Sequence, residues 1–518
     1  MKKRPVVKGT LILVLSGLIV RGIGFFYRIY LTTIIGAEGM GLFQLISPVY
    51  SLIILTLTSG ISTAVSRMTA VSTARKQYQK AGEIVSTALF IVVAAGIFAA
   101  ILLFFNASFI SSTILNEKRT YLAMKMLVPC IPVVAAAAAL KGYFYGKSNF
   151  APSAVSSIIE QIVKISSMLI IAGTFIEKGL EYACSAAILA MAIGEMAGLL
   201  VLIIFFTKVR TNKGLYIEKS LRYRKKNIIN EMMKIALPIS GNRLVTSLMS
   251  TMENILIPLR LAAGGMDKTE SISTFGKLSG MAMPLVFFPA IVTSAIATTL
   301  IPSISEDIEL KKINSANKKI ASSIKIAVAM GAIFTALFIS YPDKISECVY
   351  KGQDIGSLIF LMAYSCVFIY LHQTMLGILN GLGKQNECFW HTITGCAFRI
   401  ASIYFLLPIY GINSYIISIT ISLFVICILD IITIIKTTKL ILDIRNWVLK
   451  PIAGCIILAI SGKYIYNFIS KLPVKHSYLT YVACVVFVGI GVVLMNIFKL
   501  INLKDILKAI LPEKGKKN

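Results

Sequence analysis

Charged side chains are scarce in this chain. Only 14% of its 518 residues are Asp, Glu, Lys or Arg, and 57% are apolar, whereas soluble globular proteins have about 25% charged and 45–50% apolar residues. A soluble fold of this size needs much more polar surface. The composition therefore excludes a soluble enzyme, a disordered chain and a coiled coil, and it predicts an integral membrane protein that crosses the bilayer many times.

Acidic residues are the scarcer of the two charge types. The chain has 23 Asp and Glu against 52 Lys and Arg, which gives a net charge of +29. In a soluble protein such a surplus suggests nucleic-acid binding. In a membrane protein it has another cause, because cytoplasmic loops collect Lys and Arg. We therefore expect membrane lipids, and no nucleic acid, as partners.

Motifs for catalysis and for metal binding are missing. The nine cysteines lie almost entirely in apolar stretches, without a CxxC pair or a Cys/His cluster, so we expect neither a metal site nor a disulfide framework. The sequence has no Walker A, HExxH or GxSxG motif. A membrane glycosyltransferase would need a long loop outside the membrane to carry its acid and base groups. The connections expected to lie outside, such as 342–355, are short, so this class of enzyme is disfavoured. We predict no enzymatic activity and no cofactor. Because the sequence has no ATPase motif, any transport across the membrane would use an ion gradient, the membrane potential or the gradient of the substrate itself.

Long apolar runs are what the sequence has instead. A spanning helix needs about 20 mostly apolar residues, and β-strands are excluded because the runs are long and do not alternate. The first run is too long for a signal-peptide core and lacks a cleavage site, so it is expected to be retained. The predicted fold is all-α, with about 14 transmembrane helices near residues 10–35, 43–66, 84–107, 121–144, 153–175, 184–207, 231–257, 277–301, 320–341, 356–381, 388–408, 412–435, 447–467 and 478–499.

The distribution of Lys and Arg predicts the topology. Both termini and the even-numbered connections carry most of the basic residues, whereas the odd-numbered connections carry few. Cytoplasmic segments show this excess. We therefore predict an even number of spans, with both termini cytoplasmic.

A repeat divides the chain. The most basic connection, 208–226, follows the sixth predicted helix and is expected to lie against anionic headgroups. The segment 145–149 is echoed at 382–386, and Lys164-Ile-Ser-Ser is echoed by Arg399-Ile-Ala-Ser. Parallel repeats of this kind are a transporter architecture. The predicted domains are a six-helix bundle at 1–215, a second at 216–440, and two further helices with a basic cytoplasmic tail at 441–518.

Two arginines inside the first span are the leading candidates for substrate binding. Arg21 and Arg28 lie two helical turns apart on one face, and this span contains no acidic residue. Ionisable groups inside the membrane usually have a function or a partner. Two guanidinium groups on one face suit a phosphate or pyrophosphate. The alternatives are that the arginines reach an interface or pair with acids from other helices.

Other ionisable residues in the spans are weaker candidates. Glu160 and Lys164 are positioned to pair with each other within one helix, and His372 with Asp430 could form a proton relay. The complete set of candidates comprises the cations Arg21, Arg28, Arg243, Lys277, Lys164 and Arg399 for a cationic cavity, and the acids Glu253, Glu160 and Asp430 for coupling or pairing.

Several motifs resemble those of a known family. The segment 21–28, Arg-Gly-Ile-Gly-Phe-Phe-Tyr-Arg, is followed by Ile-Gly-Ala-Glu-Gly-Met-Gly-Leu at 35–42. Further motifs are Ala-Leu-Pro-Ile-Ser at 236–240, Phe-Gly-Lys-Leu at 275–278, Phe288-Pro289, and Thr-Leu-Ile-Pro-Ser at 299–303. Together they resemble the polysaccharide-flippase branch of the MOP exporter superfamily, and in particular the stage V sporulation protein B group of spore-forming Firmicutes.

The resemblance implies a fold, a substrate class and a location. It implies two six-helix bundles that form a V, a bacterial cytoplasmic membrane, and a lipid-linked sugar whose undecaprenyl-pyrophosphate group binds in a cationic cavity. The last two helices would form a groove for the lipid tail. In the related lipid II flippases, cavity arginines come from helices one, two and eight. Arg21 matches the first position, Arg28 matches with a shift of one residue, Lys277 replaces an arginine, and the helix-two arginine has no counterpart.

We therefore expect a flippase for an anionic lipid-linked cell-wall precursor that uses alternating access, with cell-wall synthesis enzymes as candidate partners. Two alternatives stay open. One is an ion-coupled exporter of drugs or organic cations from the same superfamily, although cations outnumber the clear acids in the spans. The other is a membrane scaffold for cell-wall synthesis that transports nothing.

Overall fold

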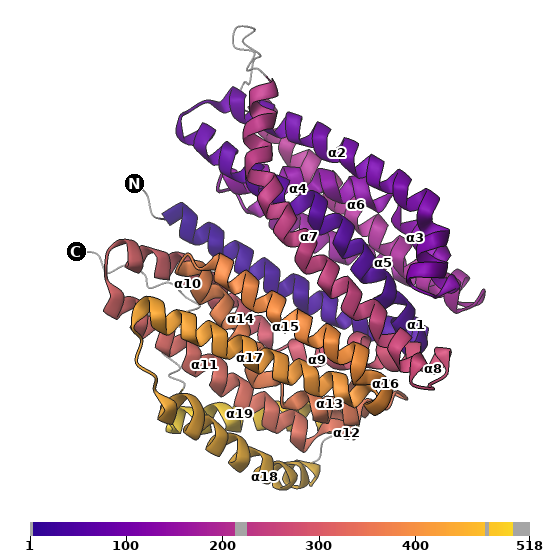
Figure 1. The fold of residues 1–518 in the computed structure, drawn as a ribbon, viewed down its shortest axis with the longest axis vertical. Coiled ribbons are helices and arrows are strands. Elements are labelled where there is room, and N and C mark those ends of the chain that lie inside the picture. Colours follow the sequence, from indigo (N-terminus) through magenta and orange to yellow (C-terminus); the bar gives the residue numbers. More distant parts are fainter. Residues whose placement is uncertain (1–3, 213–224, 472–475, 501–518) are drawn as a thin grey trace. The chain divides into compact units, whose positions relative to one another are not determined.

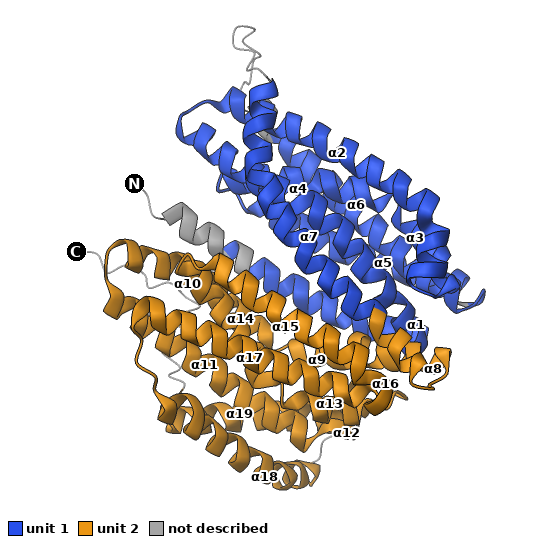
Figure 2. Ribbon diagram, in the orientation of Figure 1, with its two compact units in different colours: residues 1–255 blue, residues 256–518 orange. Residues whose placement is uncertain are grey.

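The computed structural model describes residues 4–212, 225–471 and 476–500, and in these residues the regular structure is entirely helical (Figure 1). The fold class predicted from composition is confirmed: the chain is an all-α, multi-pass membrane protein. Its contacts divide it into two compact units, unit 1 at residues 1–255 and unit 2 at 256–518 (Figure 2).

Unit 1 contains the N-terminal helices. They are α1 (Arg4–Ala74), α2 (Tyr78–Phe109), η1 (Ile110–Ile114), η2 (Lys118–Thr120), α3 (Tyr121–Leu127), α4 (Cys130–Gly146), α5 (Ala151–Ile176), α6 (Leu180–Asn212) and most of α7 (Lys225–Ala263).

Unit 2 contains the remaining helices. They are α8 (Lys268–Phe275), η3 (Gly276–Ala282), α9 (Met283–Phe287), α10 (Ala290–Glu309), α11 (Ile313–Ser340), α12 (Pro342–Val349), α13 (Gly356–Ala363), α14 (Cys366–Gly381), α15 (Gln385–Phe405), α16 (Leu407–Tyr410), α17 (Ile412–Thr438), η4 (Arg445–Leu449), α18 (Lys450–Ser470) and α19 (His476–Ile497).

A kink at Gly36 separates the first two predicted spans, both of which lie within α1. Gly36 has φ +65°, a conformation that L residues with side chains seldom adopt. The predicted helices at 10–35 and 43–66 therefore form one long element with a sharp change of direction. The kink also places Glu38, just beyond Gly36, near the connection between α2 and α3.

Proline accounts for two of the three bent spans. Helices α3 and α4 meet at Pro129 with a bend of 44°, and α9 and α10 meet at Pro289, where the broken span bends by 59°. Helices α13 and α14 also form a bent pair, at 56°. Proline removes a backbone hydrogen bond and clashes with the preceding turn, which accounts for the first two breaks.

The predicted number of 14 spans is not confirmed. Among the described residues, eight helices are long and apolar enough to cross a membrane, or eleven if each bent pair is one span. Two features account for much of the difference. The kinked α1 is one helix that contains two predicted spans, and α7 and α15 carry the charged and polar side chains that make their hydropathy low.

Helix α7 packs with unit 1. Ser240 donates a hydrogen bond to the carbonyl of Thr56, and Thr251 donates one to the carbonyl of Pro48. Gly60 of α1 lies against the backbone of Ala236. The compact units consequently divide at 255/256, inside α7. The predicted six-helix bundle boundary at 215/216 and the separate C-terminal pair stay predictions, and residues 213–224 of the basic connection and 501–518 of the tail lie outside the described residues.

A polar connection joins the last two helices to the rest of unit 2. Asp443 follows α17, accepts hydrogen bonds from the backbone and side chain of Asn446, and lies 3.7 Å from the Lys325 amine of α11. The hydrogen bonds from Asn446 and the charge of Lys325 hold the pKa of Asp443 below its ordinary value. These contacts fix the start of η4 and α18 against α11.

Candidate functional site

The cationic face of α1 is met in unit 1 by a third cation from α5. Arg21 is exposed and Arg28 is half-buried, as the spacing of two turns predicts for one helix face. Lys164 lies close enough to Arg28 for their charges to interact, and its amine sits 4.8 Å from the centroid of the buried Tyr27 ring. The structure thus brings Lys164 close to Arg28, and Arg21 lies two turns from Arg28 on the same helix face.

Glu160 pairs with a different lysine from the one expected. Its carboxylate lies 3.8 Å from the amine of Lys141 on α4, whereas Lys164 donates to the side chain of Gln161. Gln161 in turn donates to Glu160 at 3.1 Å. The lysines and the glutamate therefore form one connected network across α4 and α5, in place of a simple pair within α5.

Glu195 of α6 extends this network. Its carboxylate accepts a hydrogen bond of 3.4 Å from Tyr50 of α1, and it interacts electrostatically with Glu160, Lys141 and Lys164. The close packing of α5 and α6 depends on small residues, since the position of a Cβ on Gly194 would lie 2.7 Å from the carbonyl oxygen of Glu160.

The remaining candidates of unit 1 are on α7. Arg243 is exposed, and Glu253 is buried with 6% of its surface accessible. Glu253 lies two residues after Thr251, whose hydroxyl is hydrogen-bonded to α1. The two charged residues therefore have different surroundings, although they share one helix.

In unit 2 the predicted cations have separate environments. Lys277 lies in η3 and is half-buried. Arg399 of α15 donates to the hydroxyl of Ser422 on α17 at 2.9 Å and to the sulfur of Cys396 at 3.1 Å. Arg399 is thus held by neighbours within its own unit.

Asp430 is the most buried acid of unit 2, with no accessible surface. One of its carboxylate oxygens lies 3.1 Å from Nδ1 of His372 on α14, and the other lies 2.8 Å from Nδ1 of His391 on α15. Both imidazoles are largely buried, with 16% and 14% of their side chains exposed. The carboxylate is therefore held between two histidines from two other helices.

Sequence reasoning missed His391 and gave Glu195 no role. A single histidine in an apolar stretch carries no spacing signal, and its partner is distant in sequence. The internal repeat did carry a signal for the two acids. Glu195 and Asp430 are separated by the same number of residues as the echoed Lys164 and Arg399. The repeat thus places one acid at matching positions of α6 and α17, half-buried at Glu195 and fully buried at Asp430.

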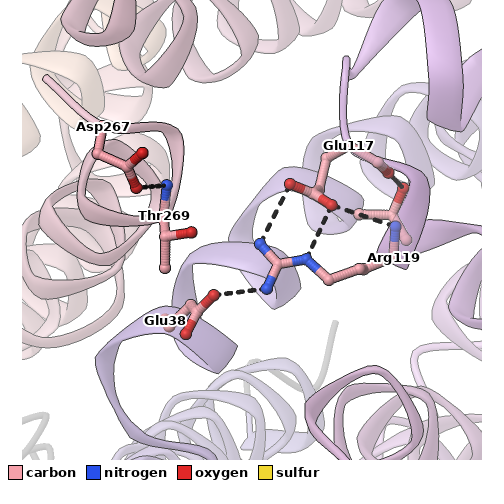
Figure 3. Close-up of polar contacts among 6 residues, drawn as sticks. Glu38, Glu117, Arg119, Asp267 and Thr269 are labelled. Carbon is pink, nitrogen blue, oxygen red and sulfur yellow. Dashed lines mark hydrogen bonds and ion pairs between the residues drawn. The ribbon is translucent and has the colours of Figure 1, made fainter. Parts of the chain in front are cut away.

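Unit 1 also has an ionic cluster where the connection between α2 and α3 meets the kink of α1. Arg119 of η2 bonds with Glu117 at 2.9 Å and with Glu38, just beyond the α1 kink (Figure 3). Glu117 is buried, and its side chain also accepts from the backbone N–H of Arg119. One guanidinium therefore holds two carboxylates from separate segments.

An apolar pocket of about 370 Å³ lies in unit 1 where α2 faces the α3–α4 break. Its lining contains no charged side chain, so its chemistry suits hydrocarbon and not a headgroup. The lining residues are Ile97, Ala100, Ile101, Phe104, Phe105, Val128, Pro129 and Pro132.

Comparison with known families decides the classification. The model of a family described as Polysaccharide biosynthesis protein matches residues 6–307, which is more than half of the chain. The chain belongs to this family. Stage V sporulation protein B of Bacillus subtilis (strain 168) is 29% identical over 456 residues, 87% of each chain. Lipid II flippase MurJ of the same organism is 24% identical over 430 residues, 76% of each chain.

Solved structures show the same fold. The inward closed conformation of lipid II flippase MurJ superimposes with a TM-score of 0.69 and 14% identity, covering 95% of this chain and 99% of that one. An inward-facing multidrug resistance MATE family transporter of the MOP superfamily gives a TM-score of 0.63 and 15% identity, covering 83% and 95%.

These likenesses confirm the resemblance inferred from the sequence motifs at 21–42 and 236–303. The chain has the fold of MOP-superfamily membrane transporters, and the relatives named above are flippases, transporters and a sporulation protein, not enzymes. The prediction that the chain is not an enzyme is thereby confirmed. The substrate and the orientation of the termini stay predictions.

Proposed function

We propose that the protein is a flippase that moves an anionic lipid-linked cell-wall precursor across the cytoplasmic membrane by alternating access. The substrate class is an undecaprenyl-pyrophosphate sugar, and a precursor of spore cortex peptidoglycan is the specific candidate. The observation that carries the proposal is the cationic face of α1, where Arg21 and Arg28 share one side of the helix and Lys164 of α5 lies close to Arg28.

The chemistry of this face favours a pyrophosphate. Guanidinium groups grip phosphate oxygens with two parallel hydrogen bonds, and in a low-dielectric site such bonds are strong. Glu160, the acid near Lys164, is also paired with Lys141. A diphosphate carries the negative charge that suits a face with several cations. The predicted contributions of Arg243, Lys277 and Arg399 to the same cavity are part of the proposal.

The alternative of an organic-cation exporter needs acids that are available to a cationic substrate. Glu160, Glu195 and Asp430 each contact a side chain of their own unit, namely Lys141, Tyr50 and the two histidines. Glu253 is 6% exposed. These contacts and this burial make the described acids poorly suited to hold a cationic cargo.

The test is transport in proteoliposomes. Fluorescent lipid II and simpler polyprenyl-pyrophosphate sugars are offered to the wild type and to Arg21→Ala and Arg28→Ala. Loss of a charge-assisted contact of about 1.5–3 kcal/mol predicts flipping that is roughly ten- to a hundredfold slower at low substrate concentration. Arg21→Lys is the matched variant, because it keeps the charge but loses the bidentate geometry, and intermediate activity is expected.

Two outcomes would reject the proposal. If a folded and correctly oriented wild type flips none of these lipids, the scaffold and the exporter become the better explanations. If the wild type flips them and Arg21→Ala does so equally fast, the cationic face of α1 is not the headgroup site.

A further inference from the structure

Two imidazoles hold one carboxylate within the described part of unit 2, and the proposed flippase function gives this cluster no task. His372 of α14 and His391 of α15 contact opposite oxygens of Asp430 on α17. The three residues come from three helices. A change in the charge of the cluster therefore acts directly on how these helices are held together.

Charge balance favours a proton as the ligand. When both imidazoles are neutral, each Nδ1–H donates to Asp430 and the cluster carries one negative charge. A buried charge without compensation is costly in the bilayer. One added proton converts one imidazole to an imidazolium, and the cluster becomes neutral without any movement of its heavy atoms. Histidine is the side chain suited to such uptake near neutral pH.

The titratable groups near the cluster do not supply the compensating positive charge in place of this proton. Cys388 of α15 and Cys427 of α17 interact electrostatically with Asp430 and are neutral thiols in their ordinary state. Lys384 and Glu387, near His391 at the start of α15, pair with each other at 2.8 Å. On the adjoining α10 and α11, Asp307 pairs with Lys319, and Lys325 pairs with Asp443.

The position of the cluster provides a route for exchange with water. His391 lies less than two turns from the start of α15 at Gln385, and both imidazoles retain some accessible surface. In the predicted topology the connection before α15 is cytoplasmic. A proton can therefore reach the imidazoles from the cytoplasmic side while Asp430 stays fully buried.

We infer that His372, Asp430 and His391 form a proton-binding site that couples the transport cycle to the proton gradient. Occupation of the site keeps α14, α15 and α17 together, and loss of the proton favours their rearrangement. The inference rests on the proposed function for its role in transport, but the binding of the proton can be tested separately.

The direct test uses the small number of histidines. The chain has only three, so ¹⁵N-histidine labelling of the full-length protein in nanodiscs gives three imidazoles, with His476 at the start of α19 as the reference. His372→Gln and His391→Gln assign the signals. The signals are followed from about pH 5 to 8, the range in which histidine ordinarily gains or loses its proton, and the inference expects the two imidazoles to share one added proton. In Asp430→Asn their protonation is expected to shift to lower pH by about one unit or more, because the carboxylate that stabilises the imidazolium is gone.

Matched variants separate the site from general effects. Glu195→Gln changes the corresponding acid of unit 1 and is expected to leave the titration of both histidines unchanged. Asp430→Glu, which keeps the charge, is expected to retain the coupled titration if Asp430→Asn does not fold. Imidazoles that stay neutral across this pH range in the wild type, or a titration that Asp430→Asn does not move, would overturn the inference.

A transport measurement tests the coupling. In sodium-free proteoliposomes, an imposed pH gradient should accelerate flipping by the wild type but not by His391→Gln, while both bind polyprenyl-pyrophosphate lipid equally. Acceleration that requires sodium and ignores the pH gradient contradicts proton coupling. If the wild type does not flip the lipid at all, the proposed function fails, and the NMR titration still decides whether the site binds a proton.

Discussion

At the residue scale, Arg119 shows how one side chain can hold separate segments together. It bonds with Glu117, the residue that caps its short helix η2, and with Glu38 just beyond the kink of α1 (Figure 3). Removal of the guanidinium leaves two carboxylates close together, one of them buried. Arg119→Gln is therefore expected to lower the free energy of unfolding by about 1–3 kcal/mol. Thermal unfolding of the purified protein in detergent measures this effect.

The neighbouring residue supplies the control for this prediction. Lys118 is exposed and lies in the same helix, so Lys118→Gln removes one positive charge without removing the bonds to Glu38 and Glu117. Its stability should match that of the wild type. Arg119→Lys should be intermediate, because it keeps the charge but not the fork of donors. Equal melting temperatures for Arg119→Gln and Lys118→Gln would show that the cluster contributes nothing.

At the scale of elements, glycines set how closely the helices of unit 1 approach. A Cβ on Gly142 of α4 would lie 2.6 Å from the carbonyl oxygen of Ser62 on α1, whereas a Cβ on Gly173 of α5 would meet nothing within 4 Å. Gly142→Ala is expected to force α1 and α4 apart and to cost about 1–3 kcal/mol. Gly173→Ala should keep or raise stability, because alanine favours helix over glycine. Thermal unfolding of the two variants side by side tests the difference, and similar melting temperatures would contradict it.

The same scale shows what could be predicted from the sequence. Long apolar runs identify the helices because the bilayer fixes their length, and the paired Arg21 and Arg28 share a face because helix periodicity requires it. The kink at Gly36 and the packing of α7 with unit 1 could not be predicted, since both depend on contacts between distant segments. The sequence suggested His372 with Asp430, but the second imidazole, His391, could not be predicted because the contact joins residues of different helices.

At the scale of the whole molecule, the sequence predicts that both termini are cytoplasmic. The prediction rests on the excess of Lys and Arg in the tails and even-numbered connections. Fusions to the C-terminus of the full chain test it, because green fluorescent protein exported unfolded stays dark and alkaline phosphatase is inactive in the cytoplasm. We expect a fluorescent first fusion and an inactive second one.

A second insertion makes this test sensitive to the number of spans. The connection 342–355 is odd-numbered in the predicted topology, so alkaline phosphatase placed there should be active while the C-terminal fusion is not. Among the described residues, eight to eleven spans are counted by length and hydropathy alone, and α7 and α15 do not meet that criterion because of their charged and polar side chains. Of these two helices only α15 lies between the reporters, so α15 must cross the membrane for them to fall on opposite sides as predicted. If 342–355 and the C-terminus report the same side, the number of crossings between them is even, and the cytoplasmic exposure of the His391 end of α15 must be reassigned with it.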